Sequence, residues 1–570
     1  MKINMKTRLI ALGSALILAF SLFGCQIKTS DESGKDLETS QPDKQVEVST
    51  DPMVKYEPPI TVTTVKSLDD AMQQMQGVKE DVLTNNNWIN SYKEELGINV
   101  EYEWTVPGSQ YEQKINTQIA ANDLPDFFPV TANQMKLLVD SGMVADLSQT
   151  FADNATEFTQ QMMEDDNHVA ISQATYGNKL MALPQVNGNR DGASMMWIRQ
   201  DWLDNLGKEA PKTMDELMKL AAAFTNEDPD KNGVNDTYGI ALNKDVITGG
   251  LNDATGIFEG FGAYVNGWLK NQDGKLVFGL VQPEIKDGLE ALSTMYENGY
   301  LDKEFSAKDN SKASEDIIGG KAGITFGQHW IAFWPLQDAI NANPDADWVA
   351  YSIPSATSSP AKVMVHGSTG SFYAVNVNAK NPEAIVKLYN YFYQKDCALS
   401  PDYDSKYHVT STLMMERPDE AFQWSAITSM YPMQNLFIHR GVKEYFDGDK
   451  SVLENAWISD NALQCEQYVE DPVANQSLWA SYRWSGPESA FTVVDYYDTN
   501  SLMLQNEYIM GNTDSMMQYN TTLNQLTLET FTKIIMGSSP IDEFDTFVEQ
   551  WYNLGGEAIT EEVSAIVIGQ

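Results

Sequence analysis

Cysteine and histidine, the usual ligands of transition metals, are scarce in this sequence. The chain has 570 residues but only 3 cysteines and 5 histidines, scattered along its length. It contains no CxxC pair or Cys/His cluster, so nothing in the sequence indicates a zinc site. The GxSxG, HExxH and P-loop motifs are absent too. The stretch His366-Gly-Ser-Thr-Gly370 differs from GxSxG by one residue, since it has histidine in place of the first glycine. The hydrolase, metalloprotease and nucleotide-binding classes that carry these motifs have no support here.

Basic residues are also few. There are 38 Lys and Arg against 80 Asp and Glu, which gives a formal net charge of -42. Such a surface repels phosphate backbones, so we expect no nucleic-acid partner. Acidity alone names no ligand, because a solvated acidic surface also keeps an exported protein soluble. Hydrophobic residues make up 42% of the chain, enough for large cores, and the length suggests about two to four domains.

A long apolar run occurs at the N-terminus, from Leu9 to Phe23, directly after a short basic segment. The run is too short to span a bilayer comfortably, so residues 1–24 are predicted to be a signal peptide. It ends in Leu22-Phe23-Gly24-Cys25, which resembles the bacterial lipobox, although Phe23 is bulkier than is usual at its position. The resemblance implies that Cys25 is lipidated and becomes the new N-terminus. A plain signal peptide with a chance cysteine is the alternative.

Residues 25–56 are polar and charged. A segment with so few large apolar residues cannot bury enough surface to order itself, and we expect a disordered tether there. If Cys25 carries a lipid, one possible cysteine pair remains. The sequence leaves open whether Cys397 and Cys465 form a disulfide.

The body of the chain alternates between strand and helix patterns. Strands are predicted at residues 60–65, 98–104, 126–130, 195–198, 238–242, 323–327 and 371–377 from β-branched and aromatic runs. Helices are predicted at residues 88–96, 111–121, 135–139, 201–206, 213–224, 283–298 and 382–392. This alternation predicts an α/β fold with mostly parallel sheets.

One loop, Asp228-Pro-Asp-Lys-Asn-Gly-Val-Asn-Asp-Thr-Tyr-Gly239, has the spacing of an EF-hand calcium loop. Oxygen-bearing side chains occupy positions one, three, five and nine, and a glycine occupies position six. Position twelve is Gly239 in place of the bidentate Glu. The loop joins a predicted helix to a predicted strand, whereas a calcium sensor needs a helix pair that opens. A structural clip is therefore favoured, and a loop without metal is the alternative.

Several stretches in this order resemble the extracellular solute-binding proteins of bacterial ABC importers. The similarity is greatest to the LipO-type lipoproteins and the calcium-containing alginate-binding proteins of family 1. It covers about residues 57 to 568. The stretches are residues 122–127, 142–147, 196–203, 211–217, the calcium-like loop, 319–330, 373–383 and 534–556.

The resemblance implies a two-lobed fold of the periplasmic-binding-protein type II, with ligand in a central cleft and multiple hinge crossings. We expect lobe 1 to comprise residues 57–183 and 354–430, and lobe 2 to comprise residues 184–353. Residues 431–570 are expected mainly in lobe 2, with a possible return to lobe 1. The calcium ligands it implies are Asp228, Asp230, Asn232, the Val234 carbonyl and Asp236, and Ca²⁺ would have a structural role.

A sugar site needs aromatic platforms for ring faces and polar side chains for hydroxyls. Ligands of open α/β sheets bind beyond the carboxyl ends of strands. Most of our candidates therefore follow predicted strands or the first crossing, and two come from an aromatic-rich C-terminal stretch. The predicted ligand-binding residues are Asn87, Trp88, Asn133, Gln185, Asn187, Arg190, His329, Trp330, Trp457 and Trp484.

Taken together, these features predict a monomeric receptor that is lipid-anchored to the outer face of the cytoplasmic membrane. It would capture a carbohydrate, with an oligosaccharide as the first expectation, and deliver it to the permease of an ABC importer. A peptide or another polar solute is the alternative ligand. A secreted glycoside hydrolase, whose two carboxylates sequence spacing cannot locate, and a cell-surface adhesin are remoter alternatives.

Overall fold

The computed structural model describes residues 51–569 except 70–71, 74, 76, 189, 248–249 and 409–416. The predicted signal peptide, Cys25 and the tether up to residue 50 lie outside the described residues. The tether ends earlier than expected, because Met53 and Tyr56 pack against a hydrophobic core. The Tyr56 hydroxyl also donates a hydrogen bond to Glu383 Oε1 at 2.7 Å. No described helix has the length and apolar character needed to cross a bilayer.

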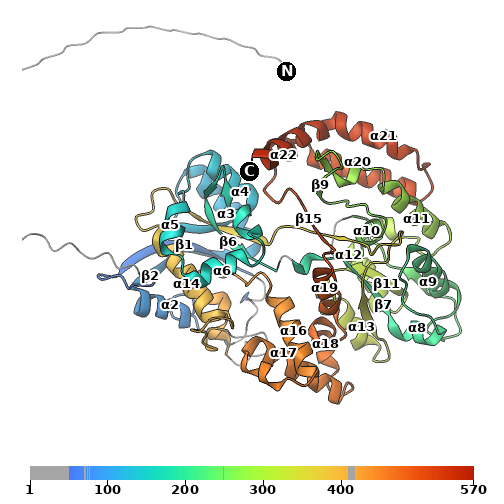
Figure 1. The fold of residues 1–570 in the computed structure, drawn as a ribbon, viewed down its shortest axis with the longest axis horizontal. Helices are drawn as coiled ribbons and strands as arrows, with labels where there is room; N and C mark the ends of the chain where they lie inside the picture. Colours follow the sequence, from blue (N-terminus) through green and yellow to red (C-terminus); the bar gives the residue numbers. More distant parts are fainter. Residues whose placement is uncertain are drawn as a thin grey trace, which may run out of the picture. The chain divides into compact units, whose positions relative to one another are not determined.

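Two hydrophobic cores confirm the predicted α/β, two-lobed fold (Figure 1). The core of lobe 1 takes residues from the ranges 62–186 and 372–465. The core of lobe 2 takes residues from 193–365 and 479–563, and also Leu436. The chain therefore passes between the cores at 186–193, 365–372 and 465–479.

The second and third crossings lie later than we expected from the sequence. Residues 354–365 stay in lobe 2 because β13 (Val363–Val365) pairs in parallel with β15 (Met503–Gln505). Residues 431–465 contribute mainly to lobe 1, through α16 (Gln434–Phe446) and α17 (Ala456–Glu470). Helix α16 serves both lobes, since Leu436 joins the core of lobe 2 while Ile438 and Val442 join that of lobe 1.

Lobe 1 holds a parallel pair and a three-stranded sheet. Strand β1 pairs with β2 in parallel, and β14 lies between β3 and β6, antiparallel to both. The strands are β1 (Ile60–Leu68), β2 (Ile98–Pro107), β3 (Phe127–Val130), β4 (Thr175–Tyr176), β5 (Lys179–Leu180), β6 (Ala182–Val186) and β14 (Thr369–Val375). The helices, besides α16 and α17, are α2 (Asn87–Ser91), α3 (Gly108–Ala121), α4 (Ala132–Asp140), α5 (Ser148–Asn154), α6 (Glu157–Glu164), α7 (Val169–Gln173) and α14 (Glu383–Asp396).

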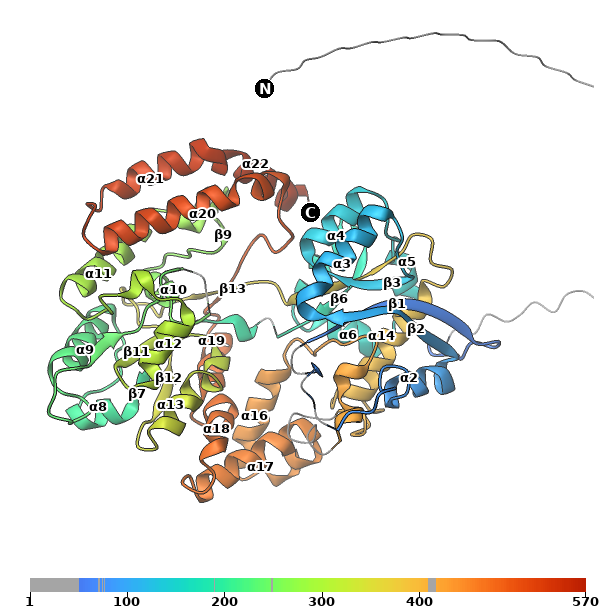
Figure 2. The same cartoon turned by 180° about the vertical axis from the view of Figure 1, so that it is seen from behind.

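Lobe 2 is built on a four-stranded sheet in the order β12-β7-β11-β8. Its strands are β7 (Met195–Arg199), β8 (Tyr238–Ile240), β11 (Ala322–Gly327) and β12 (Trp348–Tyr351), with β9 (Trp268–Lys270) and β10 (Leu276–Phe278) as a separate pair. Its helices are α8 (Gln200–Leu206), α9 (Met214–Asn226), α10 (Thr255–Gly260), α11 (Ile285–Glu297), α12 (Asn310–Ile318), α13 (Leu336–Ala342), α18 (Trp479–Ser485) and α19 (Ala490–Thr499). Helices α20 (Asp514–Ile535), α21 (Glu543–Trp551) and α22 (Glu557–Gly569) complete it, and Figure 2 shows α20 beside α11.

The expectation of mostly parallel sheets is wrong. Only β1–β2 and β8–β11 run parallel within the main sheets, and β7 is antiparallel to both β11 and β12. Strands run antiparallel because the chain crosses repeatedly between the two lobes. Strand β14 enters lobe 1 from the other lobe, so it starts at the edge of the sheet where β3 and β6 end.

Cys397 and Cys465 are both buried free thiols, so the described structure holds no disulfide between them. Both lie in the core of lobe 1. A capping box begins α9, since the Thr213 side chain accepts from the Glu216 N–H while the Glu216 carboxylate accepts from the Thr213 N–H.

Candidate functional site

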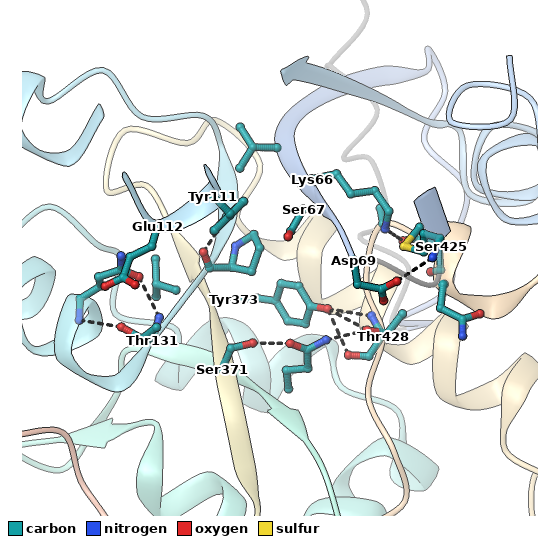
Figure 3. Close-up of a pocket in the computed structure, with 18 of the residues that line it drawn as sticks. Lys66, Ser67, Asp69, Tyr111, Glu112, Thr131, Ser371, Tyr373, Ser425 and Thr428 are labelled. Atoms are coloured by element: carbon teal, nitrogen blue, oxygen red, sulfur yellow. Dashed lines mark hydrogen bonds between the residues drawn. The ribbon is translucent and has the colours of Figure 1, made fainter. Parts of the chain in front are cut away.

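A cavity of about 310 Å³ opens in lobe 1 where β1 and β3 end (Figure 3). Its walls also include Ser371 and Tyr373 of β14 and the segment 422–428. The ends of strands leave polar backbone and side chains exposed beside an apolar core, which is why α/β sheets bind ligands there. The polar lining residues are Lys66, Ser67, Asp69, Tyr111, Glu112, Thr131, Gln134, Gln185, Ser371, Tyr373, Gln423, Ser425 and Thr428.

Hydrogen bonds fix the back wall of this cavity before any ligand binds. The Tyr373 hydroxyl accepts the Thr428 N–H at 2.8 Å and donates to the Thr428 carbonyl at 3.1 Å. Gln185 donates from Nε2 to Thr428 Oγ1 at 2.6 Å and accepts a hydrogen bond from the Ser371 hydroxyl. Figure 3 shows the Tyr373 hydroxyl directed at Thr428. Gln185, a predicted ligand residue, thus lies in the cavity, and the network holds it in place.

Lys66 brings a cation into the same cavity. Its Nζ donates to the Ser425 carbonyl at 2.7 Å, and Figure 3 shows the side chain directed at that residue. Burial lowers the pKa of Lys66 to about 8, and the nearby Asp69 carboxylate opposes that change. An ammonium group with an incomplete hydration shell can bind a hydroxyl or a carboxylate.

An exposed tryptophan lies at the carboxyl end of β11 in lobe 2. Strand β11 ends at Gly327, and a short 3-10 helix, η5 (His329–Ala332), follows. Trp330 is 37% exposed, and its Nε1 donates to Gln328 Oε1 at 2.9 Å. Gln328 in turn donates to the Gly192 carbonyl at 3.2 Å. Because its nitrogen is already satisfied, the ring is available as an apolar platform.

A second cavity, of about 300 Å³, lies next to this tryptophan. A Cβ on Gly250, which lines the cavity, would be 3.7 Å from Trp330 Cζ2. Gln328 lines it too, and the chain crossing contributes Gly192. The other lining residues are Ser194, Thr255, Glu259, Tyr264, Val265, Asn266, Met364 and His366.

The predicted ligand residues His329 and Trp484 bond to each other and anchor the 3-10 turn that carries Trp330. Trp484 Nε1 donates to His329 Nδ1 at 2.8 Å, and Phe491 packs 4.9 Å from the His329 ring, between ring centroids. Burial lowers the pKa of His329 to about 3, so its ring is neutral at physiological pH. Since the Trp484 N–H and His329 Nδ1 are used on each other, we infer that this pair fixes the turn that presents Trp330.

Two predicted tryptophans belong to the core. Trp88 is 0% exposed and stacks on Phe392, with ring centroids 5.0 Å apart. Trp457 is 2% exposed, and its Nε1 faces His408 Nδ1 at 3.4 Å. A buried ring cannot offer its face to a sugar, so we correct both assignments. Two of the rings that pack on Trp88, Phe392 and Tyr407, lie some 300 positions away in the sequence, beyond the reach of local patterns.

The three predicted asparagines are used in the structure of the protein itself. Asn87 donates to the Lys406 carbonyl at 3.1 Å, and Asn133 Oδ1 accepts the Asn512 N–H at 2.7 Å. Asn187 begins the first crossing, where its N–H donates to the Ser368 carbonyl at 2.6 Å. None of the three lines either cavity. Arg190 begins a 3-10 turn in the same crossing, η2 (Arg190–Gly192), and only its backbone is described.

Sequence reasoning missed the polar lining of lobe 1, above all Lys66 and Tyr373. A signal for the first was present, since Lys66-Ser67 directly follows the predicted strand 60–65. A lysine has no ring face on which a sugar can stack, so it does not meet the criterion of an aromatic platform. Tyr373 lies within a strand, and only its register against Leu183 of β6 and Pro129 of β3 brings it to the cavity.

The calcium-like loop links α9 to β8. Asn232 donates to Asp230 Oδ2 at 2.8 Å and to Asp236 Oδ1 at 3.2 Å, and the Gly233 N–H donates to Asp228 Oδ2 at 3.1 Å. Asp228 Oδ1 is buried and has no hydrogen-bond partner among the described atoms. Burial and the neighbouring Asp228 and Asp236 carboxylates raise the pKa of Asp230.

Two observations disagree on whether this loop binds a metal. Its ligand types suit calcium, but its carboxylates are not gathered around one position. The carboxylate, amide and carbonyl oxygens are those that calcium prefers, and the unpartnered oxygen leaves room for a cation. Within the described part of the chain, however, no group of three or more His, Cys, Asp or Glu side chains is gathered closely enough to hold a metal. The Asn232 amide, which bonds to both Asp230 and Asp236, stands between these carboxylates.

Comparisons with known proteins point to one family. A family model described as bacterial extracellular solute-binding protein matches residues 67–396. The polygalacturonan/rhamnogalacturonan-binding protein YtcQ of Bacillus subtilis (strain 168) is 27% identical over 345 residues, 60% of this chain and 59% of the relative. The lipoprotein LipO of the same organism is 28% identical over 233 residues, 40% of this chain and 44% of the relative.

A third relative is the fructooligosaccharide ABC transporter substrate-binding protein FusA of Streptococcus pneumoniae serotype 4 (strain ATCC BAA-334 / TIGR4). It is 28% identical over 267 residues, 45% of this chain and 47% of the relative. The matched region therefore spans 44% to 59% of the length of these three relatives.

Solved structures share the fold at low sequence identity. An HMO-binding solute-binding protein from Bifidobacterium longum infantis ATCC 15697 has a TM-score of 0.59 at 17% identity, with 90% of this chain and 99% of that chain covered. The alginate-binding protein AlgQ2 without calcium ion has a TM-score of 0.56 at 15% identity, with 91% and 99% covered.

Proposed function

Because the chain belongs to the family of bacterial extracellular solute-binding proteins, we propose that it is the receptor of an ABC importer. It captures an oligosaccharide between its two lobes and delivers it to a membrane permease. The sugar assignment rests on one observation: polar groups and an exposed aromatic ring both lie at strand ends, one set in each lobe. Lobe 1 offers fixed polar groups around Thr428, and lobe 2 offers the exposed ring of Trp330. Sugars need both, since they have apolar ring faces rimmed by hydroxyls.

The relatives support the choice of ligand class. YtcQ is named for polygalacturonan and rhamnogalacturonan, and FusA for fructooligosaccharides. One of these ligands is acidic and the other neutral, so the relatives favour carbohydrate without choosing its charge. The proposal includes no catalytic step, and it assumes a monomer.

Lipid attachment at Cys25 is part of the proposal. It rests on the Leu22-Phe23-Gly24-Cys25 motif and is supported by the relative LipO, which is named a lipoprotein. The anchor would place the receptor on the outer face of the cytoplasmic membrane, close to its permease.

Calcium binding by the loop 228–236 is also part of the proposal. Asp228, Asp230, Asn232, the Val234 carbonyl and Asp236 would hold the ion, which would neutralise the Asp228 and Asp236 carboxylates that raise the pKa of Asp230. AlgQ2 without calcium ion and a FusA EF-hand mutant, both among the similar structures, favour this assignment. The ion would fix the connection from α9 to β8 and takes no part in ligand binding.

The test is a thermal-shift screen of the full chain against kestose, trigalacturonate, a human milk tetrasaccharide and a peptide pool. A ligand that binds only the folded state at a hundredfold excess over its Kd stabilises it by about 2.7 kcal/mol. We expect a shift with one sugar class and no breakdown of that sugar.

Two tryptophan variants show whether the shift comes from the proposed site. Trp330→Ala is expected to abolish the shift. Trp334→Ala is the matched control, because Trp334 is 39% exposed in the same segment, whereas Trp330 is the ring that approaches Gly250 of the lobe 2 cavity. A shift with peptides alone would discard the carbohydrate assignment and keep the receptor.

A further inference from the structure

Glu259 of α10 is a buried carboxylic acid that opens onto the cavity of lobe 2. It is 2% exposed, and it lines the cavity next to Trp330. Its Oε1 accepts the Met364 N–H at 2.8 Å, which ties α10 to β13. Its Oε2 is buried and has no hydrogen-bond partner among the described atoms. One oxygen is thus structural, and Oε2, which shares the cavity with the Ser194 hydroxyl that interacts with this carboxyl, can accept a further partner there.

The position of this acid is set by close packing of α10. A Cβ on Gly256 would lie 2.4 Å from Phe326 Cδ1, so glycine lets the helix approach β11. Thr255, one turn before Glu259, also lines the cavity, and its buried Oγ1 likewise has no partner among the described atoms. An unsatisfied buried polar atom destabilises the folded protein, so two in one cavity indicate a ligand that satisfies both.

Among the described residues, no lysine or arginine lines the cavity around Glu259. Asp253 precedes the helix, Tyr264 and His366 line the cavity, and Tyr497 approaches from α19. Burial raises the pKa of Glu259 to about 8, with a further rise from Asp253, while hydrogen bonds from Met364 and Ser194 oppose it. Burial lowers the pKa of His366, so its ring is neutral at physiological pH.

We propose that Glu259 binds a ligand hydroxyl as a neutral acid and thereby selects an uncharged sugar ring in the cavity of lobe 2. The protonated acid donates from Oε2 to the hydroxyl oxygen, and the Thr255 hydroxyl provides a second contact. The inference rests on the proposed function, since it concerns the ligand of the same cleft. Beyond that function, Glu259 is assigned as a residue that binds the sugar in lobe 2, and the sugar is assigned as uncharged.

A pH series on the full chain tests this. Binding of kestose (neutral), trigalacturonate (anionic) and a glucosamine trimer (cationic) is measured by calorimetry from pH 6.5 to 9.5. If only the protonated acid binds, the affinity for kestose falls about 30-fold over this range, in proportion to the protonated fraction. Lys66 titrates in the same range, so the wild type is compared with a variant that changes Glu259 alone.

Glu259→Gln is that variant, because an amide keeps the acceptor for Met364 and mimics the protonated acid. We expect it to bind kestose within about threefold of wild type at pH 6.5 and to lose the part of the pH dependence that wild type alone shows. Glu259→Leu has a similar volume but no polar atom, and it should lose affinity about tenfold or more. Its melting temperature reports separately on the tie to β13.

Three results would overturn the inference. Equal pH profiles for wild type and Glu259→Gln would show that Glu259 is only structural. Preference for the glucosamine trimer, lost in Glu259→Gln, would show an ionised acid that binds a cation. Preference for trigalacturonate would show a site that selects an acidic sugar. In each case a loss of sugar binding in Trp330→Ala would leave the proposed function intact, whereas binding of none of the probes would discard both.

Discussion

At the scale of single residues, two tryptophans with opposite exposure should give opposite phenotypes. Trp88 is 0% exposed and Trp330 is 37% exposed. Trp88→Ala removes a packed ring, and we expect it to lower the free energy of unfolding by about 3–5 kcal/mol while the folded fraction still binds sugar. Trp330→Ala should change stability by about 0.5 kcal/mol or less and abolish binding. For both variants, urea denaturation measures the free energy of unfolding and calorimetry measures the binding of sugar. A Trp330→Ala protein as unstable as Trp88→Ala would show that its ring is core.

Lys66 should leave a signature in the dependence of stability on pH. Burial lowers its pKa from 10.5 to about 8 in the folded protein. Between these values the unfolded chain binds more protons than the folded one, so this residue makes stability rise with pH. Lys66→Met removes that contribution. The free energy of unfolding of wild type minus that of Lys66→Met should increase from pH 8 to pH 10.5, by on the order of 1 kcal/mol after solvent screening. If the difference in the free energy of unfolding between wild type and Lys66→Met were the same at pH 8 and pH 10.5, the lowered pKa of Lys66 would be contradicted.

At the scale of elements, the loop between α9 and β8 should respond to calcium. We expect a chelator to lower the melting temperature of wild type, since loss of an ion present at a hundredfold excess over its Kd costs about 2.7 kcal/mol. Asp228→Asn with Asp230→Asn should lower the melting temperature in calcium and make it insensitive to the chelator. Asp273→Asn is the matched control, because Asp273 is an exposed acid in another tight loop of lobe 2. Equal metal content in the wild-type and double-variant proteins would contradict the assignment.

The elements also show how far local patterns reach. The run Ile60-Thr-Val-Thr-Thr-Val65 predicted β1 correctly, but the strand continues to Leu68. Those last residues carry Lys66 and Ser67 to the cavity, so a strand end placed too early hid them. The direction of β14 could not be predicted, because it depends on which lobe the chain comes from. Trp330 does lie exposed directly after the buried strand β11, at the kind of position where α/β sheets bind ligands, and its role in binding stays a prediction.

At the scale of the whole molecule, a fourth link joins the lobes in addition to the three crossings. Residues 506–513, which we call the strap, connect β15 to α20 and touch lobe 1. The Ile509 carbonyl accepts from Gln173 Nε2 at 3.0 Å, and the Asn512 N–H donates to Asn133 Oδ1 at 2.7 Å. A Cβ on Gly511 would lie 2.6 Å from the Ala132 carbonyl oxygen. Contacts this close make the strap a fixed point about which the lobes can turn.

Gly511→Ala should therefore impair lobe closure without touching either cavity. We expect saturating sugar to lower the radius of gyration of wild type in small-angle scattering, because closure brings the lobes together. The added methyl group forces the strap away from α4, so Gly511→Ala should show a smaller decrease and bind sugar several-fold more weakly. Asn512→Ala is the matched control, because its backbone N–H still bonds to Asn133. Closure in Gly511→Ala equal to that of wild type would show that the three crossings alone guide the motion and that the strap is only a connection.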